Sequence, residues 1–300
     1  MMKIDGIAAF LAVVEAGSVS NAAQRLSLSK SVVSERLAEI ERTLGATLLH
    51  RTTRKLTLTE DGLAFLPRAN RIMQEIAEAA GDMAERRGTL AGPLRIAAPV
   101  TFGRMHLGPA LYPFLAAHPK IELSLDLDDR RVDAVSDGYD AILRHGPIFD
   151  SRLVAWTLAP SRRLLVASRE YLERCGRPIS LAELEGHRGI FYTNRGVADW
   201  RFQTPDGVVQ LRAQLGLRVN NGDMMRDAAI AGLGIALLPT FIVGASIKEG
   251  SLVPIDVGCQ ATEEFIYMAH PEGRRPAAKL RAIADHLKAT FGNPPYWEPS

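Results

Sequence analysis

Cysteine is scarce in this chain. Its 300 residues include two cysteines, Cys175 and Cys259, and neither belongs to a Cys-x-x-Cys pair. So low a count excludes a disulfide-stapled scaffold and a cysteine-based zinc site. We expect two free thiols in a reducing compartment, with a structural disulfide or a redox switch as the alternative.

Long hydrophobic runs are also missing, although 47% of the residues are hydrophobic. No stretch reaches the roughly 20 apolar residues that a membrane helix needs. The N-terminal run Ile7 to Val14 (IAAFLAVV) lies between Asp5 and Glu15, and Lys3 is the only basic residue before it. A secretion signal has a basic start, a longer apolar run and a cleavage site. We therefore expect a cytoplasmic protein without a membrane partner.

Signatures of catalysis are absent as well. The chain has no Gly-x-Ser-x-Gly, His-Glu-x-x-His, phosphate-loop or strand-linked Gly-x-Gly-x-x-Gly motif. Its seven histidines are scattered without the spacing of metal ligands. We expect no enzyme activity, no catalytic residue, no metal site and no cofactor.

An excess of charge of one sign is missing too, because the formal net charge is +2. This balance neither demands nor excludes a nucleic-acid partner, so the positions of the charges must decide. The length favours two or more domains, because 300 residues exceed what one hydrophobic core usually serves.

Residues 1–60 begin with the pattern of two short helices. Apolar residues recur at helical spacing from Ile4 to Val14, and Gly17 ends that helix. Ser18 is a cap for the next helix. Ala22 and Ala23 in its middle permit another helix to cross closely.

A third helix follows after a tight turn, with Ser29 as its cap. One face is apolar and is predicted to be buried: Val33, Leu37, Ile40 and Leu44. The opposite face carries short or polar groups: Lys30, Ser31, Ser34, Glu35 and Ala38. Two short helices joined by so tight a turn are typical of a helix-turn-helix.

A basic segment comes next. Residues 50–55 read His-Arg-Thr-Thr-Arg-Lys, and residues 56–59 then alternate like a strand. Directly after a helix-turn-helix, a basic turn between two strands is interpreted as a wing, although an isolated basic run is usually a solvated surface. Arg51, Arg54 and Lys55 would then face the phosphate backbone or the minor groove.

A long helix starts at residues 59–61, where a threonine cap precedes two acids. Apolar residues then recur at alternating spacings of three and four: Leu66, Ala69, Met73, Ile76, Ala80 and Met83. So narrow a stripe is typical of a coiled-coil seam, because a helix lying on its own domain's core needs no such stripe. The seam is short and follows Pro67, so it would not hold a dimer strongly by itself.

From residue 94 onward strands and helices alternate, which indicates an α/β domain. The predicted strands are 94–98, 121–127, 141–143, 164–167, 190–192, 235–238 and 265–269. The predicted helices are 103–117, 132–138, 171–176, 223–232 and 276–291.

These patterns also carry a family resemblance. The run FLAVVEAGSVSNAAQRLSLSKSVVSERLAEIERTLGATLLHRTTRKLTLTEDG, from Phe10 through Gly62, resembles the DNA-binding domain of LysR-type transcription regulators. The segments DAILRHGPIFDSRLVAWTLAPSRRLLVASREYLERCGRP and AAIAGLGIALLP resemble the regulatory domain of the same family, which is similar to periplasmic solute-binding proteins. Together the two resemblances cover essentially the whole chain.

The resemblance implies a multidomain fold. An all-α winged helix-turn-helix DNA-binding domain takes residues 1–60, and a linker (dimerisation) helix with a hinge takes 61–90. An α/β, two-subdomain, periplasmic-binding-protein-like effector domain takes 91–300. Its subdomain I is expected at about 91–162 and 264–300 and its subdomain II at about 163–263, with crossover strands near Arg162 and Glu263.

In this family the third helix enters the major groove and the wing contacts the DNA backbone. The implied DNA-binding residues are Ser29, Lys30, Ser31, Ser34, Glu35, Arg36, Arg51, Thr52 and Arg54. Glu35 departs from the family, which commonly has a basic residue after the serine matched by Ser34. Glu35 either accepts a hydrogen bond from a cytosine amino group or pairs with a neighbouring arginine, and we favour the second.

The resemblance also implies an effector cleft between the two subdomains. Ligands of open α/β sheets bind beyond the carboxyl ends of strands, and the candidate residues at such positions are Thr101, Phe102, Arg144, His145, Thr193, Asn194 and Pro239. The alternatives are that Thr101 only caps a helix and that Arg144 pairs with Asp140. Because Arg144 and His145 can supply positive charge, we expect a small carboxylate as effector.

The sequence therefore predicts a LysR-type regulator whose operator binding or promoter bending responds to a small-molecule effector. Its expected partners are double-stranded DNA, the effector, RNA polymerase and further copies of itself in a homodimer or homotetramer. The tetramer and the bending come from the resemblance alone. The alternative is a solute-binding protein without a DNA-binding role, which would leave residues 1–90 unexplained.

Overall fold

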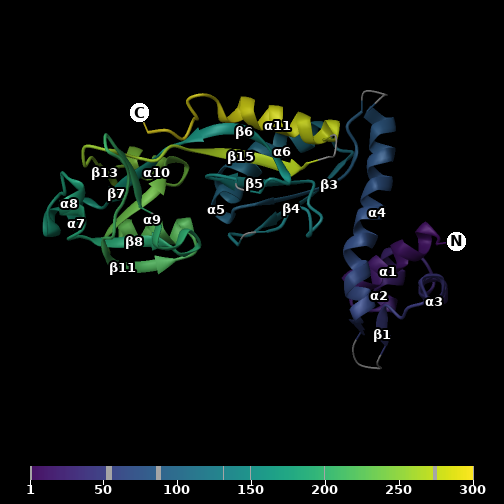
Figure 1. Cartoon of the computed structure of the whole chain (residues 1–300). Coiled ribbons are helices and arrows are strands. Elements are labelled where there is room, and N and C mark those ends of the chain that lie inside the picture. Colours follow the sequence, from purple (N-terminus) through teal and green to yellow (C-terminus); the bar gives the residue numbers. More distant parts are fainter. Residues whose placement is uncertain are drawn as a thin grey trace. The chain divides into compact units, whose positions relative to one another are not determined.

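Three short helices form the N-terminal part of the computed structural model (Figure 1). The structure describes residues 2–51, 56–85, 89–130, 132–148, 150–198, 200–272 and 276–299. The helices are α1 (Ile4–Ala16), α2 (Val19–Arg25) and α3 (Lys30–Leu44). In the described part of the chain no single helix is long and apolar enough to cross a membrane; α1 and α2 meet that criterion only together, as a pair bent by 116°.

The predicted helix ends are confirmed. Ser18 Oγ accepts a hydrogen bond from Asn21 N at 3.1 Å, and Ser29 Oγ accepts one from Val32 N at 3.3 Å. Each hydroxyl satisfies a backbone donor that the first turn of a helix leaves free. Gly17 ends α1 with a φ of +66°, a conformation that glycine adopts without strain.

One apolar core joins the three helices. It contains Phe10 and Val13 from α1, the paired alanines of α2, and Val33, Leu37 and Ile40 from α3. The predicted buried face of α3 is wrong at its end, because Leu44 is 39% exposed. The helix turns to solvent there, at its last residue before the glycine cap.

The wing forms a two-stranded antiparallel sheet of β1 (Leu49–Arg51) and β2 (Leu56–Leu58), with Leu49 opposite Leu58. The turn residues 52–55 lie outside the described residues. Glu41 Oε1 of α3 accepts hydrogen bonds from Leu48 N at 2.8 Å and from Leu49 N at 3.3 Å. The third helix therefore holds the start of the wing directly.

The long helix α4 (Glu60–Glu85) starts where predicted, because Thr59 Oγ1 accepts a hydrogen bond from Gly62 N at 2.9 Å. Its apolar stripe divides into two parts. Ala69 is fully buried, and Leu66 and Met73 pack against the core of the three helices. Farther along, Ile76 and Met83 are 37% and 52% exposed. The first half of the predicted seam thus packs on the core of its own domain, and the second half is exposed to solvent.

The described chain divides into two compact units, Met1–Pro93 with Val135–Gly138 and Leu94–Ala134 with Tyr139–Ser300. The larger unit has a first five-stranded sheet in the order β4-β3-β5-β15-β6. Its strands are β3 (Gly92–Ala98), β4 (Ile121–Leu127), β5 (Ala141–His145), β6 (Leu153–Ser161) and β15 (Glu264–Pro271). Helices α6 (Gly108–Ala117) and α11 (Ala278–Phe291) pack with this sheet.

A second five-stranded sheet has the order β11-β8-β12-β7-β13. Its strands are β7 (Arg163–Ala167), β8 (Arg188–Tyr192), β11 (Gln214–Val219), β12 (Ile235–Pro239) and β13 (Val253–Ile255). Its helices are α7 (Arg169–Cys175), α8 (Leu181–Leu184), α9 (Gly222–Ile230) and α10 (Thr240–Lys248). A small sheet of β10 (Gly207–Gln210), β9 (Arg201–Thr204) and β14 (Gln260–Ala261) adjoins it. Cys175 and Cys259 are free thiols, as expected.

The chain passes between the two five-stranded sheets twice. It leaves the first sheet after Ser161 and enters the second at Arg163, and it returns to the first sheet at Glu264. The two predicted crossovers and the α/β fold class are therefore confirmed. We call the part with the first sheet lobe I and the part with the second sheet lobe II.

Two predicted helices differ from the structure. Residues 132–138 contain a turn, closed by a hydrogen bond from Tyr139 N to Ala134 O at 3.0 Å, because the aspartates and serine of this segment favour turns and Gly138 has a φ of +72°. The helix predicted over 103–117 starts earlier and is interrupted. It begins as α5 (Val100–Phe102), continues as the π-helical turn η1 (Gly103–Leu107) and ends as α6.

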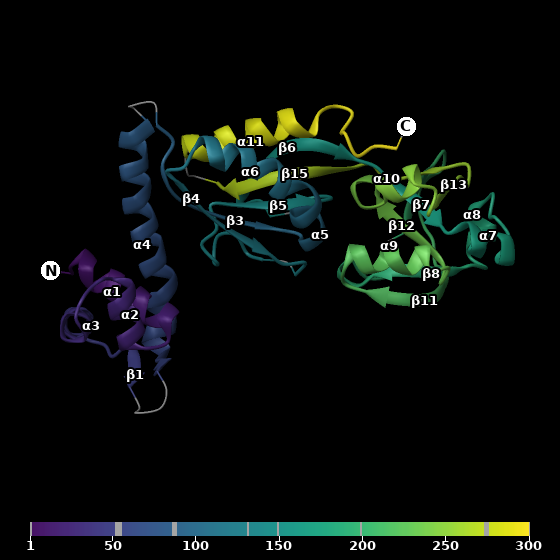
Figure 2. The same cartoon turned by 180° about the vertical axis from the view of Figure 1, so that it is seen from behind.

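The C-terminal segment after α11 runs from lobe I to lobe II (Figure 2). The Trp297 ring packs against Phe102 and Phe291, and the Glu298 carboxylate accepts hydrogen bonds from Arg162 and Thr240. A Cβ on Gly244 of α10 would lie 2.0 Å from Trp297 O. Only glycine fits at this crossing.

Gly244→Ala tests this contact because two effects have opposite signs. Alanine inside a helix is about 1 kcal/mol more favourable than glycine, whereas overpacking a tight contact costs about 1–3 kcal/mol. We expect the backbone clash to exceed the helix propensity and to lower the melting temperature, measured by circular dichroism. Gly186→Ala is the control, since its Cβ would come no nearer than 3.4 Å to any atom. A raised melting temperature for Gly244→Ala would contradict the packing of this segment.

Candidate functional site

The exposed face of α3 presents small and polar groups. Lys30, Ser31 and Glu35 are exposed, and Ser34 is partly buried. Ser29 Oγ and Ser31 Oγ lie 2.8 Å apart, within hydrogen-bond distance. Ser29 is thus engaged as the helix cap and through Ser31.

Glu35 and Arg36 do not form the pair that the sequence favoured. Arg36 Nη2 lies 2.8 Å from Asp5 Oδ2 of α1. Glu35 makes no ion pair or hydrogen bond with any residue that the structure describes. Asp5 binds Arg36 within the domain because both side chains lie between α1 and α3.

The wing residues are only partly described. Arg51 is the last residue of β1. Thr52, Arg54 and Lys55 lie outside the described residues.

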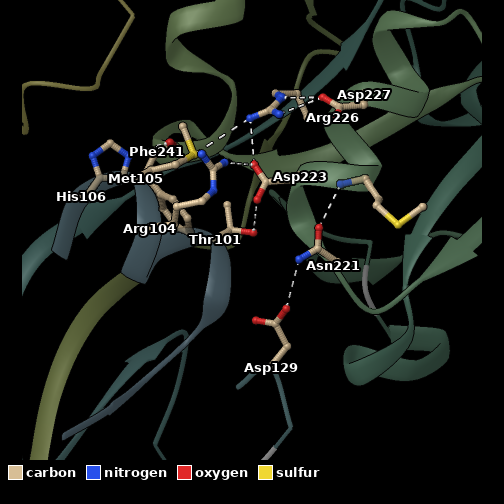
Figure 3. Close-up of polar contacts among 11 residues, drawn as sticks. Thr101, Arg104, Met105, His106, Asp129, Asn221, Asp223, Arg226, Asp227 and Phe241 are labelled. Carbon is tan, nitrogen blue, oxygen red and sulfur yellow. Dashed lines mark hydrogen bonds and ion pairs between the residues drawn. The ribbon is translucent and has the colours of Figure 1, made fainter. Parts of the chain in front are cut away.

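The larger unit contains a group of polar side chains that joins lobe I to lobe II (Figure 3). Its centre is the Asp223 carboxylate at the start of α9. Oδ2 accepts a hydrogen bond from Thr101 Oγ1 at 3.1 Å. Oδ1 accepts hydrogen bonds from Arg104 Nη2 at 2.7 Å and from Arg226 Nη1 at 3.0 Å. Thr101 and Arg104 belong to lobe I, so this carboxylate bridges the lobes.

Asp129, two residues after the end of β4, forms a second bridge. Oδ1 accepts a hydrogen bond from Val100 N at 3.0 Å, and Oδ2 accepts one from Asn221 Nδ2 at 3.3 Å. Its main-chain carbonyl accepts a hydrogen bond from Asn194 Nδ2 at 2.7 Å. Burial raises the pKa of the Asp129 carboxyl, and the neighbouring Asp223 charge acts in the same direction.

A third bridge lies where β15 begins. Arg195 of lobe II donates a hydrogen bond from Nη2 to Glu264 Oε2 at 2.8 Å and another to His145 Nδ1 at 2.9 Å. His145 Nε2 lies 3.1 Å from Glu264 Oε2, without hydrogen-bond alignment. Burial lowers the pKa of His145 to about 3, so the ring is neutral at pH 7. Burial alone would raise the pKa of Glu264, but the Arg195 hydrogen bonds and nearby positive charges outweigh it and lower this pKa to about 2.

These bridges include Thr101, His145 and Asn194 from the residues predicted for the cleft. Thr193 is exposed. Arg144 donates hydrogen bonds to the carbonyls of Arg130 and Val132, each at 3.4 Å.

Three of the predicted positions are buried or nearly buried. Phe102 is 1% exposed, with its ring against Phe241 and Phe291 in the core. Pro239 is buried at the end of β12. His145 supplies no positive charge at neutral pH, because burial keeps its ring neutral.

Comparison with known proteins places both parts of the chain. Residues 4–63 match the family described as bacterial regulatory helix-turn-helix protein, lysR family. Residues 87–292 match the family described as LysR substrate binding domain. The chain belongs to the LysR family.

Individual relatives agree along the full length. The transcriptional regulator CrgA of Neisseria meningitidis is 33% identical over 95% of this chain and 95% of its own length. The transcriptional regulator DmlR of Escherichia coli is 32% identical over 96% of this chain and 94% of its own length. The structure of full-length AphB, a virulence activator of Vibrio cholerae, covers 96% of this chain and 99% of its own, with a TM-score of 0.62 and 26% identity.

The chain is thus a LysR-type transcriptional regulator with a DNA-binding domain and an effector-binding regulatory domain. The alternative of a solute-binding protein without a DNA-binding role is set aside, because the match includes the helix-turn-helix. The relatives are transcriptional regulators of a family that is not enzymatic, as the sequence predicted.

Sequence reasoning missed most residues of the three bridges. Asn221 is the N-cap of α9, and its side chain accepts a hydrogen bond from Met224 N at 3.1 Å. The run Asn-Gly-Asp before a helical segment was a visible signal for this helix start. Arg104, Asp129 and Glu264 carry no such local signal, since their partners are distant in the sequence. Asp223 has one near partner, Arg226, but its partners in lobe I are distant.

His145 predicts a specific pH dependence of stability. In the unfolded chain its pKa is 6.5, whereas the folded value is about 3, so below pH 6.5 only the unfolded chain takes up this proton. The free energy of unfolding should therefore decrease as the pH is lowered below 6.5, and this residue contributes at most about 1.4 kcal/mol per pH unit to the decrease. Glu264 stabilises the fold above its unfolded pKa of 4.5, and that contribution is lost at lower pH. In urea unfolding between pH 7 and 5, His145→Gln should flatten the slope, and equal slopes would refute the assignment.

Glu35 predicts a measurable effect on DNA affinity. An exposed carboxylate on this helix repels phosphates, so Glu35→Gln should raise affinity for non-specific DNA at low salt by about threefold. Glu15→Gln, an exposed acid of α1 paired with Arg25, is the control. If Glu35 reads a cytosine, the same variant should instead lose about tenfold or more at the operator. Unchanged affinity for both DNAs would leave Glu35 no role in DNA binding.

Proposed function

We propose that α3 reads the operator through Lys30, Ser31, Ser34 and Glu35, and that Ser29 and Arg36 position this helix. The observation that supports it is the division of α3 into a buried apolar face and an exposed face of small polar groups. Small side chains let a helix lie close to base edges in the major groove. Arg51, Thr52 and Arg54 are the proposed backbone contacts of the wing.

The proposed chain division is the one expected from the sequence: a DNA-binding domain at 1–60, a linker helix and hinge at 61–90, and an effector domain at 91–300. Within the effector domain, subdomain I takes about 91–162 and 264–300, and subdomain II takes about 163–263. The open half of the α4 stripe, Ile76, Ala80 and Met83, is the proposed contact with a second copy. A dimer then meets half-sites roughly 34 Å apart.

The proposed effector is a small carboxylate that binds between the lobes. Support comes from the donors at Asp223, because two guanidinium groups and a hydroxyl converge there on a carboxylate. Such charge-assisted hydrogen bonds are the strong interactions of carboxylate recognition. Effector binding changes operator binding or promoter bending, and the regulator acts in the cytoplasm as a dimer or tetramer, where it recruits or blocks RNA polymerase.

Two variants of α3 test the proposed DNA surface. Ser34→Ala should lower affinity for the operator by about tenfold and leave non-specific binding unchanged, because a base contact carries sequence information. Lys30→Ala should weaken binding to all sequences and reduce the slope of log K against log salt by about one. The measurement is a mobility-shift or anisotropy titration on the DNA upstream of the regulator's own coding region, over several salt concentrations.

Arg25→Ala is the matched control for Lys30, because Arg25 is an exposed cation of α2 that pairs with Glu15 at 3.1 Å. It should leave both affinities within twofold of wild type. If Ser34→Ala and Lys30→Ala reduce specific and non-specific binding equally, the proposed roles of the two residues are wrong. Absence of any shift by the wild-type protein at low salt would refute the DNA-binding surface as a whole.

A further inference from the structure

The surroundings of Asp223 have the composition of a carboxylate-binding site. Thr101, Arg104 and Arg226 donate to its two oxygens at 2.7–3.1 Å. The Asp223 side chain is 18% exposed, and that of Arg226 is 19% exposed. Thr101 is 4% exposed. Thr101 and Arg226 are therefore largely withdrawn from water and need an acceptor, because an unpaired buried donor is costly. The Arg104 side chain is 59% exposed.

The donors come from both lobes, whereas the carboxylate comes from one. Asp223 and Arg226 lie on α9 of lobe II, and Thr101 and Arg104 lie on the α5–η1 segment of lobe I. The π-helical turn places Arg104 toward α9 (Figure 3). A Cβ on Gly103 would lie 2.3 Å from Leu127 Cδ2, so a larger residue there would require the Leu127 side chain to move.

We propose that Thr101, Arg104 and Arg226 form a carboxylate subsite that the regulator's own Asp223 fills, and that the effector's carboxylate takes the place of Asp223. This inference rests on the proposed function, in which the effector is a carboxylate. Asp223 is then an internal competitor of the effector as well as a bridge between the lobes.

Such an exchange keeps the hydrogen bonds of the donors intact. The effector carboxylate supplies the same two oxygens and the same charge as Asp223. The displaced aspartate lies at the first turn of α9, where a negative charge remains favourable near the helix start. Arg226 also keeps a second partner, because its Nη2 lies 2.8 Å from Asp227 Oδ1.

The exchange also alters the contact between the lobes. Before it, Thr101 and Arg104 of lobe I are bound to a side chain that is covalently part of lobe II. After it, they are bound to a free molecule, while the bridges at Asp129 and Glu264 persist. Effector binding therefore replaces a bridge made by the protein's own side chain with one made by the effector, whose carboxylate joins Thr101 and Arg104 of lobe I to Arg226 of lobe II.

Chemical rescue of Asp223→Ala in the full-length protein tests the subsite, with acetate as the probe. At constant ionic strength in sodium chloride, Asp223→Ala should melt about 3–8 °C below wild type. Replacing chloride by acetate should restore at least half of this loss, saturably, with half of the effect at about 10 mM. Wild type should shift by less than about 1 °C, because its site is already filled.

Asp227→Ala is the matched control, since Asp227 binds Arg226 from the same helix. This variant should show no acetate effect.

Adding Arg104→Gln to Asp223→Ala should abolish the rescue, because the strongest donor to the added carboxylate is lost. Equal responses to acetate and chloride, an equal response of wild type, or rescue that survives Arg104→Gln would each overturn the proposal. If Asp223→Ala does not fold, Asp223→Ser replaces it, since serine is accepted at helix starts and also frees the donors. The measurement involves no DNA, so its failure is distinct from a failure of wild type to bind the operator in the titration above.

Discussion

A carboxylate that leaves water must find donors, and this constraint determines how the two lobes of the effector domain meet. Glu264 obtains its donors from Arg195, and Asp129 and Asp223 obtain theirs from residues on both lobes. Each carboxylate would be costly without its partner from the opposite lobe. The main chain connects the lobes at Arg162, near Glu263 and through the C-terminal segment after α11, so these side chains and the packing of that segment together determine how the lobes meet.

The same interactions are easy to exchange. A buried ion pair adds little net stability, because desolvation of the two charges offsets most of their attraction. Its geometry is nevertheless specific, since only certain donors fit. A cleft closed by ion pairs and hydrogen bonds therefore differs from one closed by an apolar core, because a ligand of matching chemistry can replace a partner. The aromatic group around Trp297 lies beside this polar region and supplies packing that no anion can replace.

Local patterns in the sequence were sufficient for most of the fold. The caps at Ser18, Ser29 and Thr59 follow from short-range hydrogen bonding, and the strands and helices follow from hydrophobic period. Residues 132–138 were misassigned because one turn of apolar spacing does not decide between a helix and a turn. Leu44 and Ile76 continue the helical spacing of the apolar residues and are still exposed. The spacing predicts which face of a helix is apolar, but it does not predict over what length another element packs on that face.

The candidate site was less predictable, for a physical reason. Asp223 bonds to Thr101 and Arg104, which are 122 and 119 residues away in the sequence. Nothing in the local pattern of either segment encodes the partner. Phe102 and Pro239 follow strands as ligand-binding residues do, but apolar side chains at strand ends are also where a core closes. Position relative to a strand therefore predicted Thr101, His145 and Asn194 among the residues of the three bridges, and none of their charged partners.

Within the DNA-binding unit, close packing makes the long helix and the recognition helix one rigid body. A Cβ on Gly62 of α4 would lie 2.1 Å from Leu48 O, and Glu41 of α3 binds the amides of Leu48 and Leu49. Close-packed elements of this kind transmit displacement instead of absorbing it. A rotation of the first half of α4 must therefore carry the wing and α3 with it. Under the proposed function, an effector signal that reaches α4 would therefore change the orientation of α3 on DNA and leave its proposed contact residues as they are.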